Sequence, residues 1–163
     1  MNSNMSIRQK GFTIVELLIV IVVIGILAAI TVVAYNGIQE RANFSRLQAD
    51  LKSLNKALLL YHADNGVYPV TGSATWRGYT SAVNDAFIPG LAPKYINRTP
   101  QVGLTSSYPT FLYRSDTGTD YKLIYLVSGT DTLPSAHTTS NPLIDPVRTT
   151  RAWGYWSTGG AGY

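Results

Sequence analysis

The sequence predicts an α+β protein in which one long N-terminal helix, first transmembrane and then amphipathic, packs on a small antiparallel β-sheet. Three observations support this prediction: an uncharged apolar run at residues 17–35, an apolar stripe at helical spacing over residues 44–61, and strand-like segments beyond residue 109. The 163 residues include 13 Lys and Arg, 9 Asp and Glu, and no Cys. This charge balance is too mild to indicate nucleic-acid binding by itself, and the lack of cysteine excludes a thiol nucleophile.

The apolar run at residues 17–35 is long enough to cross a membrane. Its 19 residues are mostly Ile, Val, Leu and Ala, and at about 1.5 Å per residue they span a hydrocarbon core of about 30 Å. Arg8 and Lys10 precede the run, which predicts a cytoplasmic N-terminus with the rest of the chain outside. A secretory signal peptide cleaved near residues 27–29 is the alternative, but its removal would leave the acid at Glu16 unexplained.

The helix is predicted to continue past the membrane segment, from about residue 13 to residue 65. An apolar side chain recurs there every three or four residues, at Phe44, Leu47, Leu51, Leu54, Leu58 and Tyr61. This stripe predicts the helix face that packs on the sheet. Asn36-Gly37 interrupts the pattern and is interpreted as a hinge within the helix, whereas Asn65-Gly66, followed by Pro69, predicts the helix end.

The remaining residues predict a loop region followed by strands. Residues 70–109 are rich in Gly, Pro, Ser and Thr, with a short helix expected near residues 80–87. The segments TFLYRS and YKLIYLVS flank a turn at residues 116–120 and predict a β-hairpin. RAWGYWS predicts a third strand, and residues 159–163 are expected to form a loose tail.

A carboxylate stands at the start of the apolar run, in the stretch Gly11-Phe12-Thr13-Ile14-Val15-Glu16. A charged side chain in a membrane helix is costly, about 2.5–3.5 kcal/mol at the bilayer centre, and usually has a partner. This stretch resembles the processing site of type IV pilins and type II secretion pseudopilins, and the likeness extends over residues 1–70. It implies cleavage between Gly11 and Phe12, N-methylation of Phe12, and Glu16 as the fifth residue of the mature chain.

The resemblance also implies the organisation of the chain. Residues 1–11 would be a prepilin leader peptide and residues 12–35 a transmembrane and filament-core helix. Residues 36–66 would continue this helix into a globular head, formed by the loop region and sheet of residues 67–163, in the lollipop shape of pilins. The new amine of Phe12 would pair with Glu16, in the same subunit or in a neighbour, because each charge offsets the desolvation of the other. Phe12 and Glu16 are therefore the expected assembly residues.

The function implied by this resemblance is structural. The chain would be a single-pass membrane precursor that assembles into an extracellular filament for adhesion, motility or DNA uptake. Its partners would be identical or related pilin subunits, a prepilin peptidase and methyltransferase, and a pilus assembly platform. One alternative is a pseudopilin of a type II secretion system, and another is a membrane-anchored minor pilin that binds DNA or a surface. No enzyme motif or cofactor site is present in the sequence.

Metal binding is the first of two further possibilities in the head. Major pseudopilins bind calcium in a C-terminal loop, so the resemblance brings calcium into question here. The candidate ligands are Asp116 with Asp120, or Asp131 or Asp145 with Asn141. None has EF-hand spacing, and acids in turns are normally turn formers, so no metal site is predicted.

Nucleic-acid binding is the second possibility. Basic and aromatic residues alternate near the C-terminal end, at Arg148, Arg151, Trp153, Tyr155 and Trp156. Such a pattern could stack on single-stranded DNA, whereas a strand that buries its aromatic side chains explains the same residues without a ligand.

Overall fold

The computed structural model describes residues 12–78, 87–100, 102, 109–127, 131–138 and 141–163. It divides into two compact units, Met1–Gln39 and Glu40–Tyr163. A single helix, α1 (Ile14–Asn65), contributes to both units, and its bounds agree with the predicted helix to within one residue. The expected leader at residues 1–11 and nearly all of the expected helix at residues 80–87 lie outside the described residues.

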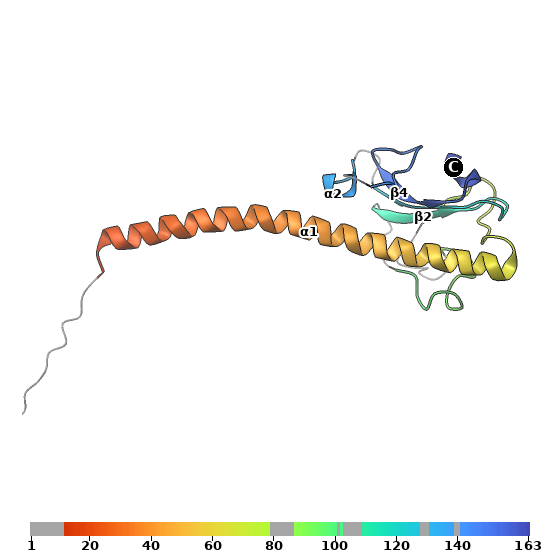
Figure 1. Cartoon of the computed structure of the whole chain (residues 1–163), viewed down its shortest axis with the longest axis horizontal. Helices are drawn as coiled ribbons and strands as arrows, with labels where there is room; N and C mark the ends of the chain where they lie inside the picture. Colours follow the sequence, from red (N-terminus) through yellow and green to blue (C-terminus); the bar gives the residue numbers. More distant parts are fainter. Residues whose placement is uncertain (1–11, 79–86, 101, 103–108, 128–130, 139–140) are drawn as a thin grey trace, which may run out of the picture. The chain divides into compact units, whose positions relative to one another are not determined.

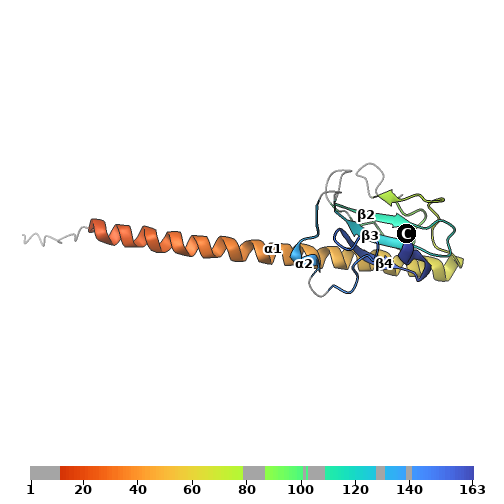
Figure 2. The ribbon, with the colours of Figure 1, turned by 90° about the horizontal axis from the view of Figure 1, so that it is seen from above.

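The second unit contains a four-stranded antiparallel sheet with the order β1-β2-β3-β4. Its strands are β1 (Arg77–Gly78), β2 (Thr110–Arg114), β3 (Lys122–Leu126) and β4 (Ala152–Trp156). β2 and β3 form the predicted hairpin, and β4 is the predicted third strand; only the two-residue β1 was not expected. The strands lie over the part of α1 that belongs to this unit (Figures 1 and 2). The α+β prediction is therefore confirmed.

The core lies between α1 and the inner face of the sheet. The helical stripe is buried as predicted, because Leu47, Leu51, Leu54 and Leu58 are at most 2% exposed. Side chains point alternately to the two faces of a strand, so each strand sends every second residue towards the helix. These inner residues are Phe111 and Tyr113 of β2, Leu123 and Tyr125 of β3, and Trp153 and Tyr155 of β4.

The outer face of the sheet also carries an apolar cluster. Ile124, Leu126 and Ala152 are buried there beneath the partly buried side chains of Trp76 and Leu112. Beyond β4, residues 143–145 continue the antiparallel pairing: Gly154 N donates to Leu143 O (2.8 Å) and Asp145 N donates to Ala152 O (3.0 Å). The outer edge of β4 is thus occupied by the chain itself.

The prediction of a loose C-terminal tail is wrong. Residues Gly159–Gly162 form a 3₁₀ turn, η1, and Gly160 is buried. Gly160 packs against the main-chain oxygen of Tyr121 so closely that a side chain at position 160 would have no room. A side chain at position 159 would likewise collide with Asp120, so Gly159 and Gly160 reflect close packing rather than mobility. A short helix, α2 (Ser135–Thr138), precedes this region and was also not predicted.

Candidate functional site

The first turn of α1 gives Glu16 a partner in its own chain. Glu16 Oε2 accepts hydrogen bonds from the main-chain nitrogen and the hydroxyl of Thr13, both at 2.8 Å. Glu16 N in turn donates to Thr13 Oγ1 (3.2 Å). This reciprocal arrangement is a capping box, which satisfies helix-start donors that have no partner within the helix. Phe12 is 86% exposed just before this turn, while Gly11 lies outside the described residues.

The helix that follows this turn is apolar and exposed. In the described part of the chain, one helical segment, Ile14–Thr31, is long and apolar enough to cross a membrane. Its large side chains are about half or more exposed within the unit, including Leu17, Ile21 and Ile24. A continuous apolar surface of this kind requires a lipid or protein environment.

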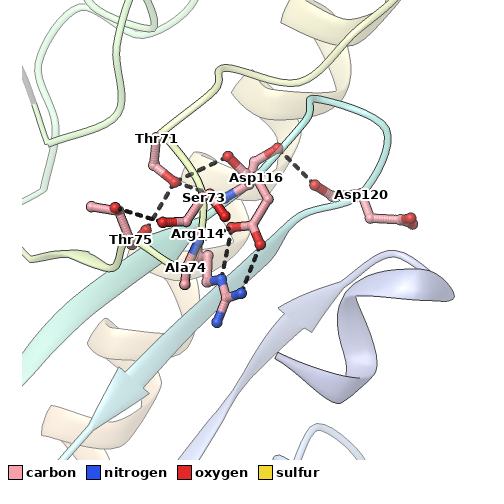
Figure 3. A network of polar contacts seen from close by, with 8 residues as sticks. Thr71, Ser73, Ala74, Thr75, Arg114, Asp116 and Asp120 are labelled. Atoms are coloured by element: carbon pink, nitrogen blue, oxygen red, sulfur yellow. Dashed lines mark hydrogen bonds and ion pairs between the residues drawn. The ribbon is translucent and has the colours of Figure 1, made fainter.

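Asp116, one of the candidate calcium ligands, is already bound by protein groups (Figure 3). Its Oδ1 accepts from Arg114 Nε (2.8 Å) and Ala74 N (3.1 Å), and its Oδ2 accepts from Arg114 Nη2 (2.7 Å). The hydrogen bonds from Arg114 lower the pKa of the Asp116 carboxyl. Close by, Thr71 N donates to Ser115 O (2.8 Å) and Ser115 N donates to Thr71 Oγ1 (3.1 Å). This network fastens the loop before β1 to the hairpin, which favours a structural role for Asp116.

Asp120, the other acid of the β2–β3 turn, holds the C-terminal segment. Its Oδ1 accepts hydrogen bonds from Ser157 Oγ (2.7 Å) and Gly159 N (3.1 Å). The Asp120 main-chain oxygen accepts from Ser115 Oγ (2.7 Å). Asp120 therefore connects the hairpin turn with the beginning of η1. The described residues contain no group of three or more His, Cys, Asp or Glu placed to hold a metal ion.

A buried ion pair that was not predicted from the sequence joins β3 to the segment at residues 143–145. Lys122 Nζ lies 2.8 Å from Asp145 Oδ1, and both side chains are 0% exposed. Arg148 Nη1 lies 3.0 Å from Asp145 Oδ2. The available signal was the single lysine in the otherwise apolar strand KLIYL, because an isolated buried lysine needs a partner.

The basic and aromatic residues near the C-terminal end do not form one surface. Trp153 is 0% exposed in the core, and Tyr155 packs against the same core, whereas Trp156 points to the opposite face of the sheet. The alternation of strand β4 separates these aromatic rings. Arg148 stacks over the ring of Trp76, 4.9 Å from its centroid. The interpretation as a strand that buries its aromatic residues is the one that the structure supports.

An aromatic cluster surrounds His137 of α2. The His137 ring stacks on Phe44 (4.6 Å between centroids) and meets Trp153 edge-on (6.2 Å). His137 is 3% exposed, and its Nδ1 is buried without a hydrogen-bond partner among the described residues. Burial lowers the pKa of His137, while the nearby Glu40 carboxylate acts in the opposite direction. The cluster thus favours the neutral imidazole.

Comparison with known proteins places the N-terminal site in a described motif. A family model named "prokaryotic N-terminal methylation motif" matches residues 7–32. This stretch includes the capping box and most of the exposed apolar helix. No solved structure matches the chain.

Several relatives of the chain are named type II secretion system core protein G. The chain is similar to the type II secretion system core protein G of Vibrio cholerae, with 33% identity over 112 residues, covering 69% of this chain and 76% of that protein. The protein of the same name from Escherichia coli is 38% identical over 88 residues, which cover 54% of this chain and 58% of that protein. A fimbrial protein, EcpC, of Eikenella corrodens is 39% identical over 80 residues, covering 49% of this chain and 51% of that protein. The match to the Escherichia coli protein thus spans less than two thirds of its length.

Proposed function

The chain belongs to the family of type IV pilins and type II secretion pseudopilins, and from this membership we propose that it is a structural subunit of a helical filament. The family consists of structural subunits rather than enzymes. The subunit would be made as a single-pass membrane precursor with a cytoplasmic N-terminus. A prepilin peptidase would cleave it between Gly11 and Phe12 and methylate Phe12, and an assembly platform would add it to identical or related subunits.

The observation that carries this proposal is the placement of Glu16. Both of its hydrogen bonds from Thr13 use Oε2, and within the described residues Oε1 makes no hydrogen bond. Cleavage before Phe12 would create an amine four residues upstream, at the end of the same turn. An ammonium group paired with Oε1 would offset the cost of holding the carboxylate in an apolar bundle.

The partner amine does not exist before cleavage, so processing would add an assembly contact that the precursor lacks. A contact between Glu16 and the amine of a neighbouring subunit would be head-to-tail, and a head-to-tail contact that does not close generates a filament. Mass spectrometry of the mature protein tests the processing step. The proposal expects a chain that begins with N-methylated Phe12; a chain beginning at Met1 or just after Ala29 would contradict it.

A second candidate, a pseudopilin of a type II secretion system, is favoured by the names of the relatives. The proteins that share 58% and 76% of their length with this chain are named core protein G of that system. Deletion of the gene distinguishes the two candidates. Loss of long surface filaments would support the pilin, whereas loss of protein secretion with surface filaments intact would support the pseudopilin.

The minor pilin that binds DNA or a surface has less support. It depended on an exposed run of basic and aromatic residues, and Trp153 is buried in the core. Loss of DNA uptake or adhesion in a deletion strain that still makes filaments would be the result that favours it.

A further inference from the structure

A lysine ammonium group occupies the centre of an oxygen cage in the head. Lys122 Nζ lies on the outer face of the sheet and donates to Asp145 Oδ1 (2.8 Å), Ala161 O (2.8 Å) and Tyr163 O (3.0 Å). The side chain is 0% exposed. Carboxylate and main-chain oxygens are the ligand types that calcium uses in proteins. Here the cation at their centre belongs to the chain.

The geometry fits an ammonium group and not a metal ion. The three contacts of 2.8–3.0 Å are charge-assisted hydrogen-bond lengths, whereas calcium lies about 2.3–2.6 Å from its oxygen ligands. Three donors on Nζ match the three acceptor oxygens, so the group is fully hydrogen-bonded in spite of its burial.

Both oxygen atoms of the Asp145 carboxylate already have partners in the protein. Asp145 Oδ1 also accepts from Val147 N (2.9 Å), and Oδ2 accepts from Arg148 Nη1 (3.0 Å). Arg148 Nη1 lies 3.0 Å from Tyr163 O as well. Two cationic side chains, Lys122 and Arg148, therefore already occupy the oxygen atoms that a divalent cation would need. The calcium site that resemblance to major pseudopilins implies does not fit these residues.

We propose that Lys122 serves as a built-in cation in the place of a bound metal, and that it fastens the C-terminal segment at residues 157–163 to the sheet without calcium. The two main-chain oxygens that Lys122 binds belong to Ala161 of η1 and to Tyr163, the residue after η1. Asp120 holds the start of the same segment. The segment is thereby attached at both ends by protein groups that are present in every copy, whatever the calcium concentration outside the cell.

The first test uses the unmodified full-length chain in detergent micelles. Thermal unfolding and amide hydrogen exchange of residues 157–163 are measured in millimolar calcium chloride and in EGTA. The expected result is the same Tm and the same exchange protection in both solutions. A higher Tm or slower exchange in calcium than in EGTA would overturn the proposal, because it would show that a bound metal contributes to the segment.

The second test removes the cation. Lys122→Met keeps the length and apolar body of the side chain, and Lys56→Met, on an exposed position of α1, is the matched control. The amides of residues 157–163 should exchange at least about tenfold faster in Lys122→Met and at an unchanged rate in Lys56→Met. Unchanged exchange of these amides in Lys122→Met would refute the proposal that Lys122 fastens the C-terminal segment to the sheet. Should Lys122→Met fail to fold, the calcium comparison on the unmodified chain decides alone.

Discussion

Thr13 and Glu16 cap each other at the start of α1, with Glu16 Oε2 2.8 Å from both the main-chain nitrogen and the hydroxyl oxygen of Thr13. The contact orients the carboxylate towards the N-terminal side of the helix, where the helix dipole also favours a negative charge. The carboxylate is therefore already directed towards the place where cleavage would create an amine.

Replacing Glu16 by Val should leave membrane insertion and processing intact and reduce filament assembly, because the amine of mature Phe12 would lose its anionic partner. A tenfold or larger loss of sheared filaments is expected, because the positive amine would stay buried without its carboxylate in every subunit. The measurement is an immunoblot of sheared filaments beside an immunoblot of total mature subunit. Glu40→Gln, which removes the next acid along α1, is the control, and equal filament yields from the two variants would contradict the assembly role.

Stability should fall in mild acid because of His137. Burial lowers its pKa in the folded chain below the usual value of 6.5. At pH values beneath 6.5 the unfolded chain thus binds a proton that the folded chain does not bind, so the free energy of unfolding decreases as the pH falls towards the folded pKa. The contribution of neutral His137 to the free energy of unfolding is fully present above pH 6.5.

Unfolding measured from pH 7.5 to pH 5 should therefore show a smaller decrease in Tm for His137→Phe than for the unmodified chain. Phe keeps the ring that stacks on Phe44 and lies beside Trp153. The charged and titratable groups of the packed elements, Glu40 on α1 and Tyr125 on β3, remain the same in both proteins. Parallel pH profiles would show that His137 does not cause the acid dependence.

Replacing only one residue of the buried ion pair between Lys122 and Asp145 should lower the free energy of unfolding more than replacing both residues. Asp145→Leu leaves the buried ammonium of Lys122 without its carboxylate, and the expected loss of unfolding free energy is about 3–5 kcal/mol. The double variant Lys122→Met with Asp145→Leu removes both buried charges and should lose distinctly less. Denaturant unfolding of the full-length proteins in detergent provides the comparison. A double variant as unstable as Asp145→Leu would show that the unpaired charge of Lys122 is not the cause of the instability.

A side chain at position 154 should disrupt the sheet. Gly154 pairs with Ile124, and a Cβ there would overlap the main-chain oxygen of Leu123. Gly154→Ala is therefore expected to lower the unfolding free energy by about 1–3 kcal/mol or more. Gly37→Ala is the control, since a Cβ built at Gly37 meets nothing within 4 Å apart from its chain neighbours and the backbone of its own helix, and alanine favours a helix by about 1 kcal/mol. The difference should appear in the Tm values.

Elements with local signals were predicted well from the sequence. The end of α1 at Asn65 follows from Gly66, which adopts a φ of +74°, a conformation that glycine adopts without strain. The β2–β3 hairpin follows from two strand-like segments on either side of a short polar turn. At the N-terminal end of α1 the assignment of Phe12 and Glu16 as processing and assembly residues stays a prediction. The role of Thr13 was missed, although Thr and Glu three residues apart are a readable capping box.

The C-terminal segment could not be predicted in the same way. Its partners lie about 40 residues away, at Asp120 and Lys122, and a glycine-rich stretch has the composition of a mobile tail. Long-range hydrogen bonds of this kind leave no periodic pattern in the sequence. The separation of Trp153 from Trp156, in contrast, follows from strand alternation and was open to prediction.

The pairing of residues 143–145 with β4 affects whether copies of this protein can aggregate through the edge of the sheet. An open strand edge is a template on which another chain adds by main-chain hydrogen bonding, and stacked edges of this kind grow into amyloid. Here Leu143 and Asp145 already use the outward groups of Gly154 and Ala152. At this edge the sheet is thereby closed to the addition of a strand from another copy, and so to cross-β growth.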